Sequence, residues 1–141
     1  MKASNTCLNY LKQHEGCKLQ AYLCPAGVWT IGYGSTKGVT KGMIITQAQA
    51  DERLKADLND IEMRLNALRL NLTQGQFDAL CSFAFNVGWG NFAKSTLLRL
   101  VKVNPFDAAI DAEFRKWKHA NGVVLPGLVK RREVEIKMYR S

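Results

Sequence analysis

Two stretches of the chain place apolar residues three and four positions apart, which is the periodicity of an amphipathic helix. In the first stretch, residues 46–68, mostly charged positions separate Ala50, Leu54, Leu58, Ile61, Leu65 and Leu68. The second stretch follows Thr73 and is apolar nearly all round, with Phe77, Leu80, Cys81, Phe83, Ala84, Phe85 and Val87. The pattern predicts a long amphipathic helix followed by a buried central helix.

Capping sequences mark where helices are expected to begin. Thr46-Gln-Ala-Gln49 and Thr73-Gln-Gly-Gln76 both fit the capping box, in which side chains and backbone satisfy each other's open hydrogen-bond donors. Asn104-Pro105 predicts a further helix start, with proline at the first helical position and Asp107 in the first turn. We also expect a short N-terminal helix over about 4–14 and a last helix from Leu125-Pro126 to about residue 139.

Residues 18–42 have a different pattern. Aromatic and β-branched residues stand there between glycines, which is typical of a small antiparallel sheet. The order of elements therefore predicts an α+β fold in a single domain over 1–141: a β-rich lobe at about 18–42, a connecting helix at about 46–68 and a helical lobe over 73–141. Two lobes joined by a long helix leave a cleft between them, where a polymer would bind.

Charge is concentrated near the C-terminus. The chain carries a net charge of +8, and from Arg115 onward eight basic residues stand against two acidic ones. This favours a polyanionic partner, either nucleic acid, an anionic membrane surface or the bacterial envelope. The alternative is a solvated basic helix face.

Several classes of protein are disfavoured by what the sequence lacks. No apolar run approaches the roughly 18 residues of a membrane-spanning helix, and no apolar region typical of a secretory signal is visible. His14 and His119 stand alone, so we expect no metal and no cofactor. Without metal-type pairing or an export signal, free thiols are expected for Cys7, Cys17, Cys24 and Cys81, and a disulfide framework is the alternative.

Glu15 is the first candidate for chemistry. It is expected to end the first helix, beside Gly16 as a helix-stop residue. The helix dipole disfavours a carboxylate at a helix C-terminus, which would help to keep Glu15 protonated as an acid. The alternative is a solvated glutamate in a loop.

The residues after Glu15 carry a resemblance. Eight residues separate Glu15 from Cys24, and five separate Cys24 from Thr30. This spacing resembles the active-site signature of glycoside hydrolase family 24, the phage lysozymes or endolysins, in which an aspartate or a cysteine holds the middle position. The strings His14-Glu15-Gly16 and Val28-Trp29-Thr30-Ile31-Gly32-Tyr33-Gly34 also resemble that family.

The resemblance continues to the C-terminus in the same order. It includes Phe83-Ala84-Phe85-Asn86-Val87-Gly88, Asn91-Phe92, Ser95-Thr96-Leu97-Leu98, and Leu125-Pro126-Gly127-Leu128 with Arg131-Arg132-Glu133. It implies a lysozyme-like fold and hydrolysis of the β-1,4 bond from N-acetylmuramic acid to N-acetylglucosamine in peptidoglycan, leading to host-cell lysis. Such an enzyme would accumulate in the host cytoplasm until a separate membrane pore releases it to the wall. A monomer is the default expectation.

The resemblance also implies roles for residues. Glu15 would be the general acid, Thr30 would hold a water, and Cys24 stands at the usual aspartate position. Phe85 and Asn86 would touch the glycan from the cleft wall, and the alternative for Phe85 is a core residue. Looser substrate-contact expectations fall on Thr36, Ser95 and Asp111, and for each of these residues the alternative is packing or capping.

The chain departs from the family pattern at two positions. Ser35 stands where many relatives carry histidine, so an ion pair made by that histidine must be absent, at a cost mainly to stability. Cys24 is not a carboxylate, and three interpretations stay open: a thiolate base or electrostatic partner, a nucleophile that forms a thioglycosyl intermediate, or a dispensable residue. We favour activation of water, with inversion of the anomeric configuration.

Two other functions compete with hydrolysis. A cationic membrane-disrupting protein would act through a basic last helix whose modest apolar face comprises Val129, Val134, Ile136 and Met138. Binding of nucleic acid is permitted by the charge, but no recognised motif supports it, and we expect no nucleic-acid partner. The partner expected instead is the peptidoglycan glycan strand, with attraction of the basic C-terminal region to the anionic envelope.

Overall fold

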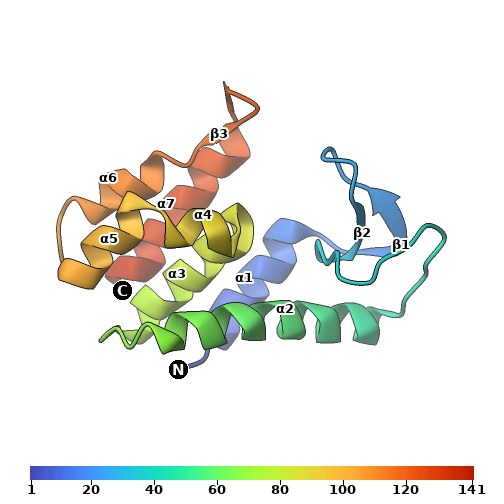
Figure 1. Ribbon diagram of the computed structural model, residues 1–141, viewed down its shortest axis with the longest axis horizontal. Coiled ribbons are helices and arrows are strands. Elements are labelled where there is room, and N and C mark those ends of the chain that lie inside the picture. Colours follow the sequence, from blue (N-terminus) through green and yellow to red (C-terminus); the bar gives the residue numbers. More distant parts are fainter. The chain divides into compact units, whose positions relative to one another are not determined.

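Seven helices and two β-hairpins make up the computed structural model, which describes residues 1–141 (Figure 1). In chain order they are α1 (Asn5–Glu15), β1 (Lys18–Leu23), β2 (Trp29–Gly32), α2 (Gln47–Ala67), α3 (Gln74–Val87), α4 (Trp89–Ala93), α5 (Thr96–Val103), α6 (Ile110–Arg115), β3 (His119–Ala120), β4 (Val123–Val124) and α7 (Pro126–Arg140). This mixture confirms the predicted α+β class. No helix combines the length and the apolar character that a membrane crossing requires.

Internal contacts divide the chain into two compact units. The sheet unit comprises Leu8–Asp60 and holds most of α1, both strands of the first hairpin and the first part of α2. The helical unit comprises Met1–Cys7 and Ile61–Ser141.

The sheet unit contains the small antiparallel sheet that the sequence predicts. β1 and β2 pair so that Tyr22 faces Thr30 and Leu23 faces Trp29. A loop of Pro25, Ala26 and Gly27 joins the strands, closed by a hydrogen bond from the Gly27 N–H to the Cys24 carbonyl. Gly27 has φ = 76°, the left-handed conformation that ends a three-residue hairpin loop and that favours glycine.

Both predicted capping boxes are present. The Gln49 N–H donates to the Thr46 hydroxyl at 3.1 Å, and the Thr46 N–H donates to the Gln49 side chain at 2.9 Å. The same reciprocal pair joins Thr73 and Gln76 at the start of α3. The two long helices therefore begin where local side-chain chemistry predicts.

α3 forms the centre of the helical unit and packs mainly against α7. The ring of Phe83 on α3 is fully buried and meets the rings of Phe92, Phe114 and Trp117 edge to face, at centroid distances of 6.0, 5.4 and 5.5 Å. Trp117 is therefore half-buried against this aromatic cluster.

The predicted helix start at Asn104-Pro105 is wrong. The side chain of Asn104 accepts the N–H of Phe106 at 3.0 Å, and that of Asp107 accepts the N–H of Ala109 at 2.9 Å. These local bonds hold the segment in turns, and α6 begins only at Ile110.

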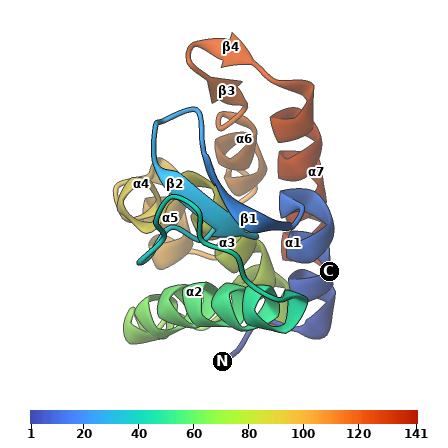
Figure 2. The same ribbon diagram turned by 90° about the vertical axis from the view of Figure 1, so that its right-hand side faces the viewer.

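A second hairpin, β3–β4, lies within the lobe predicted as helical over 73–141, so the prediction of helices alone is wrong at this point. Asn121 and Gly122 join its strands with φ values of 52° and 76°. Asn-Gly is the sequence signal of a tight two-residue hairpin turn, so the sequence did carry this information. Figure 2 shows the hairpin projecting beyond the ends of α6 and α7.

Candidate functional site

The first hairpin places Cys24 and Thr30 side by side. Thr30 lies opposite Tyr22, and the next pairs in the same register are Leu23 with Trp29 and Cys24 with Val28, the last joined by a bond from the Cys24 N–H to the Val28 carbonyl at 3.0 Å. Alternate residues of a strand share a face, so Cys24 lies on the face that carries Thr30. The buried Thr30 hydroxyl donates to the Val28 carbonyl at 2.9 Å and also lies within hydrogen-bonding reach of the thiol.

The hairpin loop favours the ionised form of Cys24. Hydrogen bonds from the backbone at Val28 and Ala26 lower the pKa of the thiol below its ordinary value, and the Thr30 hydroxyl adds to this effect. The causes are the loop's own N–H groups, which converge on the sulfur in the manner of an anion-binding nest. A cysteine at this place is therefore a better thiolate than a free cysteine.

Glu15 is the last residue of α1, and its side chain is half-buried. Gly16 follows with φ = 67°, so the helix ends there and the chain turns into β1. The predicted end of the first helix at the carboxylate is confirmed, and Glu15, Cys24 and Thr30 all belong to the sheet unit.

Gln47 connects the region after α1 to the first turn of α2. Its side-chain nitrogen donates to the hydroxyl of buried Tyr33 at 3.0 Å and to Asp51 at 3.1 Å, and its oxygen accepts from the thiol of Cys17 at 3.8 Å. Lys12 of α1 lies 3.7 Å from Asp51. These contacts join α1 and the residue before β1 to α2, and they join α2 to the residue that follows β2.

Ser35, at the position where many relatives carry histidine, is buried and joined to α2. Arg53 donates to its hydroxyl at 3.3 Å and to the carbonyl of Lys37 at 3.0 Å. Asp57, one turn further along α2, interacts with both Ser35 and Arg53. A serine and an arginine thus connect this turn to α2, which the sequence pattern did not indicate.

The remaining candidates lie in the helical unit, except Thr36, which is exposed in the turn after β2. Phe85 and Asn86 are half-buried near the end of α3.

Ser95 caps α5, since its hydroxyl accepts the Leu98 N–H at 3.1 Å and donates to the Phe92 carbonyl at 2.7 Å. Asp111 pairs with Arg140 at 2.8 Å. Capping and pairing occupy these last two side chains, and their contact with substrate stays a prediction.

The basic C-terminal region is less cationic at the surface than its sequence indicates. Arg131 and Arg132 are buried, and both pair with the buried carboxylate of Glu135, at 3.3 and 2.8 Å. Acidic partners also neutralise three exposed or half-buried cations: Arg115, Lys116 and Arg140. Among the basic residues from Arg115 onward, only Lys118, Lys130 and Lys137 form no ion pair within the chain.

The buried cluster around Glu135 reaches α3 and one of its candidate residues. The Ser82 hydroxyl donates to Glu135 at 2.6 Å, and Arg131 donates to the Ser82 carbonyl at 3.0 Å. Arg132 donates to the side-chain oxygen of Asn86 at 2.6 Å. This connection is not predicted by the sequence pattern, because consecutive arginines are typical of a solvated helix face. The available signal was a glutamate three and four residues after them, at helical spacing.

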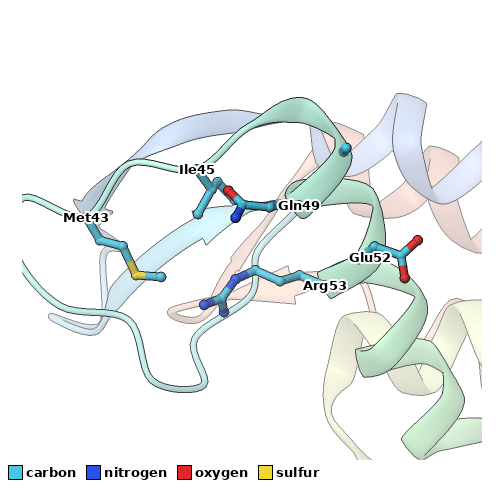
Figure 3. Close-up of a pocket in the computed structure, with 6 residues that line it drawn as sticks. Met43, Ile45, Gln49, Glu52 and Arg53 are labelled. Carbon is cyan, nitrogen blue, oxygen red and sulfur yellow. The ribbon is translucent and has the colours of Figure 1, made fainter.

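The sheet unit also has an open hollow of about 340 Å³, lined by Met43, Ile45, Ala48, Gln49, Glu52 and Arg53. Figure 3 shows the segment before α2 on one side of it and the first turns of α2 on the other. It contains none of the predicted catalytic residues.

Comparison with known proteins identifies the family. The phage lysozyme family model matches residues 12–135. The chain is 43% identical to the endolysin of Acyrthosiphon pisum secondary endosymbiont phage 1, over 100% of this chain and 99% of that protein. It is 42% identical to the endolysin of Salmonella phage P22, over 85% of this chain and 86% of that protein.

Solved structures agree with these sequence relatives. The muramidase domain of SpmX from Asticaccaulis excentricus superimposes with a TM-score of 0.88 at 35% identity, covering 99% of this chain and 98% of that one. A P22 lysozyme variant superimposes with a TM-score of 0.83 at 37% identity, covering 100% and 99%. The lysozyme-like fold and the resemblance stated from the sequence are thereby confirmed, and the chain belongs to the phage lysozyme family.

Proposed function

We propose that the chain is an endolysin that hydrolyses the β-1,4 bond between N-acetylmuramic acid and N-acetylglucosamine in bacterial peptidoglycan. Glu15 is the general acid, Thr30 positions the attacking water, and Cys24 stands in for the usual aspartate. The observation that carries the proposal is the shared face of the first hairpin, where a thiol of lowered pKa lies beside the Thr30 hydroxyl, in a chain of the phage lysozyme family.

The reaction breaks the bond between the anomeric carbon and the glycosidic oxygen. The Glu15 carboxyl gives its proton to the departing oxygen, and a water attacks the anomeric carbon from the opposite face. That water gives up a proton to the Cys24 thiolate, so charge and protons balance over the step. Attack by water on the opposite face inverts the anomeric configuration, which is the course we favour over a thioglycosyl intermediate.

The Thr30 hydroxyl is suited to positioning the attacking water, because it can accept one hydrogen bond while it donates another. It donates to the Val28 carbonyl in the structure, which leaves its oxygen lone pairs able to accept from a water. When the hydroxyl turns this single proton from the Val28 carbonyl to the sulfur, it stabilises the Cys24 thiolate instead. One side chain can therefore orient the water and the group that receives its proton.

The glycan strand is the partner, and we infer further contacts from Phe85 and Asn86, with Thr36, Ser95 and Asp111 as weaker candidates. Lys118, Lys130 and Lys137 supply the attraction to the anionic envelope. We propose that the protein acts as a monomer and reaches the wall from the host cytoplasm through a separate membrane pore. The neutralised arginines and the buried side chain of Ile136 on α7 disfavour the cationic membrane-disrupting alternative.

The test is the release of reducing sugar ends from purified peptidoglycan by the wild-type protein and by Glu15→Gln. We expect release by the wild type and almost none by the variant. Equal release by both proteins would show that Glu15 is not the acid. Leakage of intact cells without release of sugar ends by either protein would favour membrane disruption.

A further inference from the structure

Arg132 is held on three sides beside the end of α3. Its guanidinium lies over the ring of Phe83, 4.9 Å from the ring centroid, and its Nε atom is 2.8 Å from a carboxylate oxygen of Glu135. Its Nη2 atom donates to Oδ1 of Asn86 at 2.6 Å. The side chain is 1% exposed. A planar group fixed in this way aims its N–H at Asn86 in one direction.

This contact fixes which way the Asn86 amide faces. Arginine has only donors, so the amide atom that meets it must be the oxygen. The amide nitrogen of Asn86 then points away from Arg132, and it makes no hydrogen bond within the chain. Asn86 is half-buried, and its amide nitrogen is not among the inaccessible side-chain atoms that lack a partner, so this nitrogen is available to a ligand.

We propose that Arg132 is a positioning residue for substrate, which turns the Asn86 amide so that it presents only a hydrogen-bond donor to the glycan. The group recognised is an acceptor oxygen without a proton, of the kind that an acetamido carbonyl supplies. This inference rests on the proposed function, in which Asn86 contacts the glycan. Without the hydrogen bond from Arg132, the Asn86 amide could rotate, and it would then bind substrate donors and substrate acceptors equally well.

The proposed role gives a reason for burying the charged pair of Arg132 and Glu135. A buried ion pair contributes little net stability, because apolar side chains of similar volume often do as well or better. Apolar side chains could not aim a donor at Oδ1 of Asn86. Glu135 holds Arg132 from one edge of its guanidinium, which leaves Nη2 for Asn86.

The first experiment compares Asn86→Asp with Asn86→Ala in the full chain. Aspartate keeps an oxygen for Arg132, so we expect its melting temperature to be at least that of the wild type. Its second oxygen would face the substrate acceptor, so we expect KM on soluble peptidoglycan fragments to rise about tenfold, more than for alanine, with little change in kcat. Binding of an N-acetylglucosamine oligomer should weaken in parallel. An Asp variant with wild-type KM would overturn the proposal.

The second experiment separates positioning from folding. Arg132→Lys keeps a positive charge beside Glu135 but has no planar fork to reach Asn86 as well. We expect it to raise KM in the wild-type background and to have no further effect on KM when Asn86 is already alanine. A merely structural role would lower stability in both backgrounds and raise KM equally in both, and that result would overturn the proposal.

The outcomes also distinguish this inference from the proposed function. Absence of reducing ends from the wild-type protein would remove the proposed function, and the inference with it. If the wild type releases ends, Glu15→Gln does not, and Asn86→Asp keeps the wild-type KM, the proposed function stands and only the role of Arg132 is refuted.

Discussion

Arg53 donates a hydrogen bond to the hydroxyl of Ser35 at 3.3 Å, and so joins α2 to the turn that follows β2. A second bond, to the carbonyl of Lys37 at 3.0 Å, secures the same turn. The chain has no histidine at position 35 to make the ion pair expected in relatives. Instead, the charged guanidinium of Arg53 donates to the neutral hydroxyl of Ser35, and the carboxylate of Asp57 lies near both side chains.

We therefore expect Arg53→Met to lower the free energy of unfolding by about 1–2 kcal/mol, because it removes two hydrogen bonds and leaves a buried hydroxyl without its donor. Urea unfolding measures the change. Arg99→Met is the matched control, since Arg99 is exposed on α5 and makes no ion pair or side-chain hydrogen bond, and it should cost less than about 0.5 kcal/mol. Equal losses in the two variants would contradict the assigned role of Arg53.

The raised pKa of Asp57 predicts that the free energy of unfolding depends on pH. Burial raises the pKa of its carboxyl, while Ser35 and Arg53 oppose the shift. The folded chain thus binds this proton more tightly than the unfolded chain. The resulting stabilisation is full below the unfolded pKa of about 3.9 and is lost as the pH rises through the folded pKa.

Asp57→Asn removes this titration, so its stability relative to the wild type should be greatest at neutral pH and should decline as the pH falls through the folded pKa of Asp57. Thermal unfolding across the acid range measures the difference. Glu52→Gln, an exposed carboxylate on the same helix, corrects for the loss of one negative charge. A difference that grows toward acid pH would show that the sign is wrong.

Gly75 is required by a close approach between α3 and α7. A Cβ atom at this position would collide with the carbonyl oxygen of Met138 and with Ser141. We expect Gly75→Ala to cost about 1–3 kcal/mol in unfolding free energy, since the backbone atoms cannot simply rotate away. Gly127→Ala is the control, because nothing lies within 4 Å of its added Cβ in α7, and it should stabilise by about 0.5–1 kcal/mol. Similar effects of the two changes on the thermal midpoint would refute the collision.

Cys24 and Glu15 should differ in their contributions to turnover. In the proposed mechanism Glu15 is the general acid, so Glu15→Gln is expected to lower kcat about a hundredfold or more. Cys24→Ser should lower kcat less, because in the same mechanism Thr30 would still orient the water. Initial rates of reducing-end release measure both variants. An equal loss would show that the thiol is as necessary as the acid, and would favour the nucleophile interpretation.

The thiols themselves offer a further test. The loop N–H groups lower the pKa of Cys24, whereas burial raises the pKa of Cys7 to about 12 and also raises that of Cys81. Iodoacetamide should therefore modify Cys24 with a midpoint pH below that of cysteine in an unfolded peptide, and should spare the two buried thiols in the folded protein. Peptide mass spectrometry gives the rates.

Thr30→Val supplies the matched control for this measurement. It keeps the shape of the side chain and removes the hydroxyl that helps to stabilise the thiolate, so the alkylation midpoint of Cys24 should move to higher pH. A midpoint that does not move would exclude the Thr30 hydroxyl as a source of the lowered pKa.

Local signals in the sequence predicted much of this structure correctly. The capping boxes at Thr46 and Thr73, the first hairpin and the helix end at Glu15 each depend on bonds between residues a few positions apart. The same local chemistry explains the failure at Asn104-Pro105, where side-chain bonds to the following N–H groups favoured turns over a helix. The Asn121-Gly122 turn was equally local and was overlooked.

By itself the sequence determined the α+β class, the starts of both long helices and the spacing of Glu15, Cys24 and Thr30, because each of these follows from neighbours along the chain. Only the tertiary structure decided that Arg131 and Arg132 are buried and that Asn86 is oriented by an arginine 46 residues away. Charge along a sequence indicates solvation by default. Whether an arginine is instead desolvated depends on a carboxylate and a ring brought to it by other turns and helices, and in this protein Glu135 and Phe83 supply them.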